Sequence, residues 1–453
     1  MKQFFLFIIS LILFFIAPDS YSRSFCAVCA VVFIVGVIFT LKPIEKKQQF
    51  SFFNIIFLFS YFWTSFAYPL IVYGTFRDRE NIINKYIDWE NMSHTSALAL
   101  VFICAYFLGY AKKWNACVYT STSKFGTKSL RVPNGLFIFF SIAYIINACY
   151  SYFLTGNINL STGKFLTDIY FSFLVFVMYA NTNNHQNYKH DLKNFVAINM
   201  FPILFICIVF FVSMIIGDRG PAIKATLVFF ATYHFFWNKV NITKVVLFGG
   251  IFLCLLFFVR QTRLSNEGLV SGNVSMSQIE KTFNLENGNL YVFADLFLIN
   301  RELNLEYDYA KKRGMFHPEK VLFLPLYPIP IVPSVFSQLF FEKTVADMDT
   351  GSELNKYLRH VETHFGNHPA GDLFMSFGLI GVIVFSYFFG LVVSYYEKRM
   401  YSNVYTACAF IVLMSWSLYL SRASVLSIIR PLGYVYIFGY FIFSVSTKIR
   451  KKI

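Results

Sequence analysis

Charged residues are scarce in this sequence: they make up 14% of its 453 residues, whereas soluble domains contain about 25%. Hydrophobic residues reach 57%, and the mean hydropathy is +0.55. Apolar runs of about 14 to 24 residues recur along the chain, and a helix needs roughly 20 apolar residues to cross a bilayer. This composition excludes a soluble globular protein and predicts an all-α polytopic membrane protein.

The sequence also lacks two nucleotide-binding motifs, the glycine-rich phosphate loop of Walker type and the dinucleotide fingerprint. The loops predicted to face the cytoplasm are too short to hold a soluble catalytic domain. Use of ATP or of a nucleotide sugar is therefore not expected. Any reaction must take its energy from the substrate itself, and we expect no cofactor.

The apolar runs predict about twelve membrane-spanning helices, or eleven if the first or the sixth is not a span. They cover residues 4–17, 24–41, 50–73, 94–111, 135–154, 164–180, 195–216, 221–237, 242–259, 373–395, 402–420 and 424–446. Three regions follow: residues 1–259 hold the first nine helices, 260–372 form one long polar loop, and 373–453 hold the last three helices. The long loop contains no cysteine, so no disulfide framework supports it.

Lysine and arginine are unevenly distributed over the short loops between these spans. One set of alternate loops carries nineteen of them and the other set carries seven. The positive-inside rule places the richer set and both termini in the cytoplasm, and the long loop on the opposite, periplasmic side. The net charge of +15 is therefore explained by membrane orientation, and no nucleic-acid partner is expected.

Two segments of the long loop predict contact with the membrane. Residues 289–304 mix apolar and charged side chains, which indicates an amphipathic helix lying on the membrane or on the other spans. Residues 321–333 are apolar but contain four prolines, which forbid a regular helix. We expect this second segment to be interfacial or re-entrant.

Arginines on the predicted outer side are the first candidates for a binding site. Arg430 lies roughly 12 Å inside the last span at 1.5 Å per residue. A cation at that depth costs about 2.5–3.5 kcal/mol, so it needs an anionic partner, and Asp168 is the nearest acid within the spans. A substrate phosphate is the other possible partner, because guanidinium groups bind phosphate oxygens in a bidentate way. The predicted pyrophosphate-binding residues are Arg219, Arg260, Arg263, Arg422 and Arg430, with binding to lipid headgroups as the alternative.

The end of the long loop contains three of the eight histidines, His360, His364 and His368. Their spacing of four would align them on one helix face, but glycine and proline interrupt that helix and the metal-binding pattern HExxH is absent. We therefore predict no metal site. General-base or hydrogen-bonding work on a sugar hydroxyl or a phosphate is the functional interpretation, and ordinary surface histidines are the alternative.

Carboxylates in the same stretch compete with the histidines for the role of base. These are Glu353, Glu362 and Asp372. Asp372 stands just before an apolar run, so it is equally well explained as a helix cap. The predicted catalytic set is His360, His364, Glu353 and Asp372.

Three stretches resemble the oligosaccharide repeat unit polymerases, the Wzy-type O-antigen and capsule polymerases of bacteria. They are the span-opening turn Gly217-Asp-Arg-Gly-Pro221, the proline-rich stretch Leu322 to Pro333, and Gly371-Asp-Leu-Phe-Met-Ser-Phe-Gly-Leu-Ile-Gly381 at the start of the next span. The layout, with one large late loop, is similar along the whole chain. That family also has an arginine followed, after ten residues, by a glycine in an outer loop; here Arg422 and Gly433 have the spacing, but they run from a short turn into the last span.

The resemblance implies a GT-C-like glycosyltransferase of the bacterial inner membrane. Such enzymes transfer a growing glycan from undecaprenyl pyrophosphate to the non-reducing sugar of a new lipid-linked repeat unit, on the outer face of the membrane. The arginines named above would bind the pyrophosphates. The implied partners are the lipid-linked oligosaccharide, the bilayer, a chain-length regulator and a flippase.

Two alternatives stay open. An O-antigen ligase resembles the same layout and would move the glycan to a lipid A core. A lipid-linked oligosaccharide transporter belongs to a different class, which usually has paired halves and broken helices.

Overall fold

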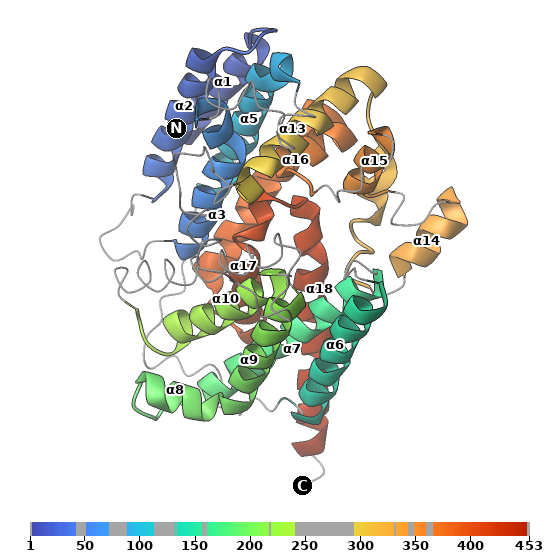
Figure 1. Cartoon of the computed structure of the whole chain (residues 1–453). Coiled ribbons are helices and arrows are strands. Elements are labelled where there is room, and N and C mark those ends of the chain that lie inside the picture. The colour runs from blue at the N-terminus through green and yellow to red at the C-terminus, as the bar shows by residue number, and fades with distance from the viewer. Residues whose placement is uncertain are drawn as a thin grey trace, which may run out of the picture. The chain divides into compact units, whose positions relative to one another are not determined.

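A computed structural model describes residues 2–41, 51–71, 88–112, 132, 134–155, 161–216, 219–240, 294–329, 332–342, 348–358 and 366–450 (Figure 1). Within these ranges every regular element is a helix, as the sequence predicts. The chain divides into two compact units. The first comprises Met1–Ala116, Leu285–Arg399 and Ser417–Ile429, and the second comprises Cys117–Asn284, Met400–Trp416 and Arg430–Ile453.

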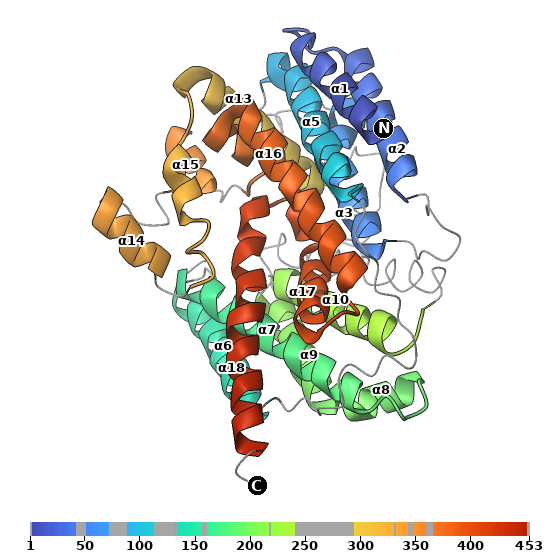
Figure 2. The ribbon, with the colours of Figure 1, turned by 180° about the vertical axis from the view of Figure 1, so that it is seen from behind.

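The first unit is built around α5 (Met92–Tyr110), which is buried along almost its whole length. It packs against α16 (Pro369–Arg399) and against two helices from the N-terminal part of the chain, as Figures 1 and 2 show. The other helices of this unit are α1 (Lys2–Phe15), α2 (Arg23–Leu41), α3 (Phe52–Phe62), the π-helix η1 (Trp63–Ala67), α4 (Tyr68–Ile71), the 3-10 helix η3 (Trp89–Asn91), α13 (Ala294–Arg313), the 3-10 helix η7 (Pro318–Phe323), α14 (Val332–Phe341), α15 (Thr350–Tyr357), and the 3-10 helices η8 (Tyr419–Ser421) and η9 (Val425–Ile428).

Two glycines let α5 and α16 come into backbone contact. A Cβ atom at Gly109 would lie 2.0 Å from the carbonyl oxygen of Tyr387, and one at Gly390 would lie 2.2 Å from the carbonyl oxygen of Tyr106. No larger residue fits at either place without moving a backbone. This is the close packing that small residues permit between membrane helices.

Helix α16 is interrupted within its apolar run. Gly378 has φ +65° and ψ −168°, a conformation that other residues rarely adopt. The interruption frees the carbonyl oxygen of Met375, which accepts a hydrogen bond from the backbone N–H of Phe316 at 2.7 Å. The first two turns of α16 are therefore anchored to the long loop, and the longer part continues beyond the break.

The apolar helices agree in part with the predicted spans. In the part of the chain that the structure describes, five helices are long and apolar enough to cross a membrane, or six if the bent pair α8 and α9 forms one span. Phe5, Ile12 and Phe15 on α1 and Val31 on α2 leave more than half of their surface exposed, as expected for side chains that face lipid. The total of about twelve spans stays a prediction, and the ninth predicted span, 242–259, lies outside the described residues.

The second unit consists of helices packed around α7 and α10. They are α6 (Asn134–Thr155), α7 (Ser161–Asn184), α8 (Leu192–Ile198), α9 (Met200–Ile216), α10 (Arg219–Phe236), α17 (Val404–Trp416) and α18 (Ile429–Arg450), whose residues from Arg430 onward belong here. The single span predicted over 195–216 is instead broken, because α8 and α9 meet at 87°. Pro202 has no N–H with which to continue the helix, and the freed carbonyl of Ile198 accepts a bond from the Asn181 side chain at 3.4 Å.

The proline-rich stretch predicted over 321–333 forms no α-helix up to Ile329, as its prolines predict, but its last two residues, Val332 and Pro333, open the helix α14. It consists of η7 followed by turns. Leu322 and Ile329 leave 56% and 42% of their surface exposed, and Leu339 on the following helix α14 leaves 74%. Such exposure of large apolar side chains fits the predicted interfacial location.

Candidate functional site

The middle of α13 carries a run of polar residues that the first unit buries. Asn300, Arg301, Glu302, Asn304 and Glu306 each expose 3% of their surface or less. The amphipathic helix predicted over 289–304 coincides with α13 from Ala294 onward and continues to Arg313, and the polar side chains of its middle are buried. Burial of polar groups costs free energy unless hydrogen bonds or opposite charges replace water, so the partners of these residues define the site.

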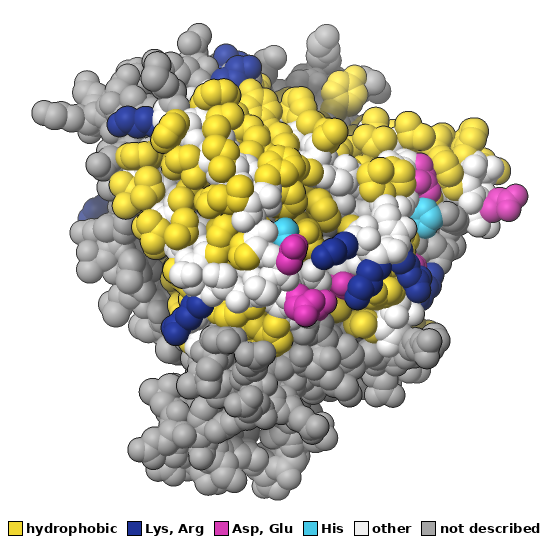
Figure 3. Space-filling view, turned by 90° about the horizontal axis from the view of Figure 1, so that it is seen from above, with side chains coloured by type: hydrophobic (Ala, Val, Ile, Leu, Met, Phe, Trp, Pro, Cys, Tyr) yellow, Lys and Arg dark blue, Asp and Glu magenta, His cyan; other side chains and the backbone are white. Residues whose placement is uncertain are grey.

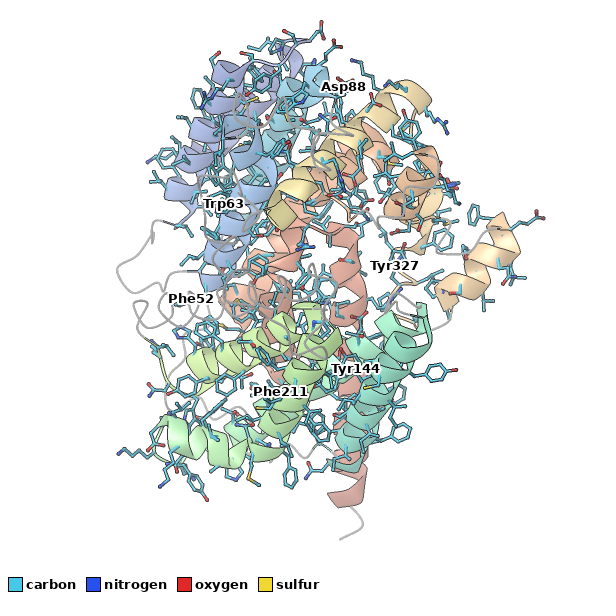
Figure 4. All side chains as sticks on the ribbon, in the orientation of Figure 1. Phe52, Trp63, Asp88, Tyr144, Phe211 and Tyr327 are labelled. Carbon is cyan, nitrogen blue, oxygen red and sulfur yellow. The ribbon has the colours of Figure 1, made fainter. Side chains whose placement is uncertain are left out.

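The two asparagines attach α13 to the N-terminal part of the chain. The side-chain Nδ2 of Asn304 donates to the carbonyl of Asp88 at 2.8 Å, and its Oδ1 accepts from the N–H of Asp88 at 3.0 Å. One turn earlier, Nδ2 of Asn300 donates to the carbonyl of Ser65 at 3.0 Å. Figure 4 labels Asp88, which lies beside α13, and Trp63, the first residue of the π-helix η1 to which Ser65 belongs. These bonds fix the helix in register.

Helix α13 also reaches the surface. Its last turn carries Lys311, Lys312 and Arg313, all exposed, in contrast to its buried middle. Figure 3 shows charged side chains gathered in a band between apolar areas of this face. The same helix therefore links a charged surface to a charged interior.

Glu306 lies against the first turn of α16. Both of its carboxylate oxygens lie 3.3 Å from the backbone nitrogen of His368, which donates to them. A Cβ at Gly371 would lie 2.0 Å from Oε2, so glycine is needed there to admit the carboxyl group. Burial raises the pKa of Glu306 well above its usual range, and the neighbouring carboxyls of Asp372 and Glu302 add to the shift. This environment favours the neutral, protonated form of Glu306.

His368 is a buried structural histidine. Its Nδ1 accepts a bond from the backbone N–H of Ala370 at 3.2 Å, so the ring proton is on Nε2, which donates to Ser65 Oγ at 2.9 Å. Burial lowers the pKa of His368 to about 3. The ring is neutral and both nitrogens are engaged, which removes His368 as a general base.

Glu302 differs from the other buried acids in its hydrogen bonding. Its Oε1 accepts a bond from Nη2 of Arg301 at 3.2 Å. Its Oε2 is buried and has no hydrogen-bond partner among the residues that the structure describes. Burial raises the pKa of Glu302 to about 7, and the charges of Arg301 and Arg422 oppose that shift. A carboxyl group that titrates near neutrality and is influenced by two guanidinium charges is suited to proton transfer.

Arg422 is the second arginine whose charge acts on Glu302, and it lies in a turn that packs against α3 and the long loop. The preceding residue, Ser421, shares a hydrogen bond of 2.5 Å with Ser60 on α3. The carbonyl oxygen of Arg422 would lie 3.7 Å from a Cβ at Gly366, so the turn lies against the end of the long loop. The Arg422 side chain is half-buried, whereas that of Arg301 is fully buried.

Asp372 and Lys320 form a second charged group at the first turns of α16. Asp372 is buried and its Oδ1 accepts a bond from the hydroxyl of Thr350 at 2.7 Å. Lys320, also buried, donates to Ser376 Oγ at 3.3 Å and lies over the ring of Phe316. Burial lowers the pKa of Lys320, against the opposing charges of Asp372, Asp349 and Glu306. Asp372 is thus held by a side chain of α15 and does not cap α16, whose Ala370 N–H is bound by His368.

Three of the predicted site residues that the structure describes lie in the first unit. Asp372 and Arg422 both belong to the first unit. Glu353 also lies there, on α15, where its Oε1 accepts a bond from Tyr309 at 3.0 Å. Arg219 begins α10, and its side chain is not described. Four predicted residues, Arg260, Arg263, His360 and His364, lie outside the described residues, as does the competing carboxylate Glu362.

Arg430 has the partner that the sequence predicts. In the second unit its Nη1 lies 3.9 Å from Oδ2 of Asp168. In the same unit Lys224 lies over the ring of Trp416, with Nζ 3.4 Å from the ring centroid. Both cations therefore have favourable contacts inside the protein, which accounts for their place in an apolar sequence.

Sequence reasoning missed Arg301, Glu302, Glu306 and Lys320. A signal was present in Asn300-Arg-Glu-Leu-Asn-Leu-Glu-Tyr-Asp308, where two glutamates stand four residues apart and so share a helix face. No family model, curated protein or solved structure matches this chain. Its function is therefore inferred from the residues described above.

Proposed function

We propose that this protein is an oligosaccharide repeat unit polymerase of the bacterial inner membrane. It transfers a glycan from a lipid pyrophosphate carrier to a lipid-linked repeat unit at the outer face. In this proposal the chain has about twelve spans, both termini are cytoplasmic, and the long loop is periplasmic. The observation that supports the reaction is the cluster of buried Arg301 and Glu302 with half-buried Arg422, to which the long loop contributes α13.

The cluster has the groups that such a transfer needs. A pyrophosphate leaving group carries negative charge that grows as the glycosidic bond breaks. Guanidinium groups in a site shielded from water stabilise this charge, and such electrostatic stabilisation is often the largest catalytic contribution. Arg422 and Arg301 are the two described arginines whose charges act on Glu302. Arg219, Arg260, Arg263 and Arg430 stay proposed pyrophosphate-binding residues.

A transporter of lipid-linked oligosaccharide is the second candidate, because one observation favours it. Helix α16 is interrupted at Gly378, and α8 and α9 form a bent pair. Discontinuous helices are common around the substrate sites of transporters. The buried acid and arginines favour transfer chemistry, so the polymerase is the stronger proposal.

The experiment compares surface polysaccharide on a gel from a strain without this gene and from the same strain complemented with the wild-type chain. We expect the deletion to reduce the ladder of long chains to a single repeat unit, and the wild type to restore it. Full-length polymer that stays on its lipid carrier would identify a ligase instead. Repeat units that accumulate on the cytoplasmic side would identify a transporter, and an unchanged ladder would contradict all three.

A further inference from the structure

We propose that Glu302 is the catalytic base, which accepts the proton of the acceptor hydroxyl through its Oε2 atom. The inference rests on the proposed function and assigns a residue to its central step. The observation behind it is geometric. Oε1 is bound by Arg301, which holds the carboxylate in place, while Oε2 is buried and has no hydrogen-bond partner among the described residues. Buried carboxylate oxygens are usually paired, so an unpartnered one is a place for a ligand hydrogen.

The other buried ionisable groups near α13 and the start of α16 are engaged in structural hydrogen bonds. His368 uses one ring nitrogen to bind the Ala370 N–H and the other to bind Ser65. Glu306 accepts the N–H of His368 with both oxygens, and Asp372 accepts the hydroxyl of Thr350. Lys320 donates to Ser376. Of Glu302, Glu306 and Asp372, only Glu302 has a fully buried oxygen without a hydrogen-bond partner among the described residues.

The charges that face Glu302 come from two elements. On α13 itself, Arg301 stabilises the carboxylate and the neighbouring Glu306 lies one turn away. From the segment after η8, the Arg422 charge also stabilises it. Burial acts in the opposite sense and raises the pKa of Glu302 to about 7. The group is therefore ionised in much of the population at neutral pH and basic enough to take a proton.

The step balances as follows. The oxygen of the acceptor sugar hydroxyl attacks the anomeric carbon of the donor glycan and forms the new glycosidic bond. The bond between that carbon and the pyrophosphate oxygen breaks, and its electron pair leaves with the lipid pyrophosphate, next to Arg422 and Arg301. The hydroxyl proton moves to Oε2 of Glu302 and is later released to water. Arg422 is the partly exposed member of the cluster, so in this proposal the substrate enters beside Arg422.

The test uses the purified full-length protein in nanodiscs. Its substrate is the lipid-linked repeat units extracted from the deletion strain, and the amount of polymer is measured against pH. We expect Glu302→Gln to lower turnover by about 10²- to 10⁴-fold, the usual contribution of a general base. Glu306→Gln is the matched control: it replaces a buried acid whose oxygens accept the N–H of His368 by an amide of the same shape on the same helix, and turnover should stay within about threefold.

The pH profile separates a catalytic role from a structural one. Wild-type turnover should fall as the pH drops below about 7, because Glu302 must be ionised. Arg422→Gln removes a charge that stabilises the carboxylate, so the same decline should begin at a higher pH. If Glu302→Gln does not fold, the pH profiles of the wild type and of Arg422→Gln still test whether Glu302 is the base. A profile without this decline, or one that Arg422→Gln leaves in place, would overturn the assignment.

Failure of the inference and failure of the proposed function give different results. Wild-type protein that forms no polymer from these repeat units contradicts the polymerase itself. Wild-type protein that forms polymer, with a Glu302→Gln variant that is equally active, contradicts only the role of Glu302.

Discussion

Helices α5 and α13 are both buried in the first unit, but in opposite ways. In α5, nineteen residues long, the buried side chains are mostly apolar, and its backbone touches α16 through glycines. In α13, twenty residues long, the buried middle is polar and charged, and hydrogen bonds attach it to η1, to Asp88 and to the start of α16. The first arrangement stabilises the fold through packing. The second costs free energy, which is expected of a functional site and not of a scaffold.

The largest expected effect on stability concerns the glycine contact between α5 and α16. Gly390→Ala should lower the free energy of unfolding by about 3 kcal/mol or more, because the new Cβ would meet a backbone carbonyl on α5. Thermal unfolding of the purified protein measures it. Gly135→Ala is the control, since no atom lies within 4 Å of a Cβ placed there. Equal melting temperatures for the two variants would show that the glycine contact does not hold the helices together.

The next effect concerns the cost of the buried charge. In the folded protein the pKa of Glu302 is about 7, above its ordinary value of 4.5, so the wild type loses stability as the pH rises through this range. Glu302→Gln carries no charge and avoids this loss. The variant should be more stable than the wild type by roughly 3 kcal/mol at about pH 8, and the difference should vanish near about pH 4.5. Melting curves across that pH range test this, and a constant difference would contradict it.

The smallest effect concerns the junction of α13 and α16. Gly371→Ala should destabilise the protein by about 1–2 kcal/mol, because the new methyl group displaces the Glu306 carboxyl, which can move in part. Introduced into a Glu306→Ala background, the same substitution should cost much less. A double-mutant cycle on melting curves measures this coupling. Additive losses would show that Gly371 is not matched to Glu306.

The comparison also explains how much the sequence predicted. Helices such as α2, α5 and α16 follow from apolar runs of about 20 residues. A helix satisfies its own backbone N–H and C=O groups with hydrogen bonds, and its apolar side chains are removed from water. The pairing of Arg430 with Asp168 was one of two predicted alternatives, beside a substrate phosphate, because a cation in an apolar span needs an anion and acids are scarce there. The break in α16 was not predicted, since glycine is tolerated inside a helix. Only the backbone conformation of Gly378 and the bond from the Phe316 N–H to the Met375 carbonyl reveal the interruption.

The candidate site was predicted less well than the fold. Spacing drew attention to the histidines, yet the role of His368 depends on Ser65, which is 303 residues away. The polar run of α13 was recognised as part of a helix, but amphipathicity normally places polar side chains outward. Its burial depends on partners from η3, η1 and α16 that no local pattern identifies.

The sequence by itself determined that this is an all-helical chain rich in helices apolar enough for a membrane, because those properties depend on composition and on local backbone bonding. Tertiary structure alone decided which charges lie in the interior. In it, Glu306 accepts a hydrogen bond at the start of α16 and His368 is hydrogen-bonded to Ser65. One oxygen of Glu302 has no donor among the described residues. The physical reason is that hydrogen bonding and desolvation of a buried group are set by neighbours distant in sequence.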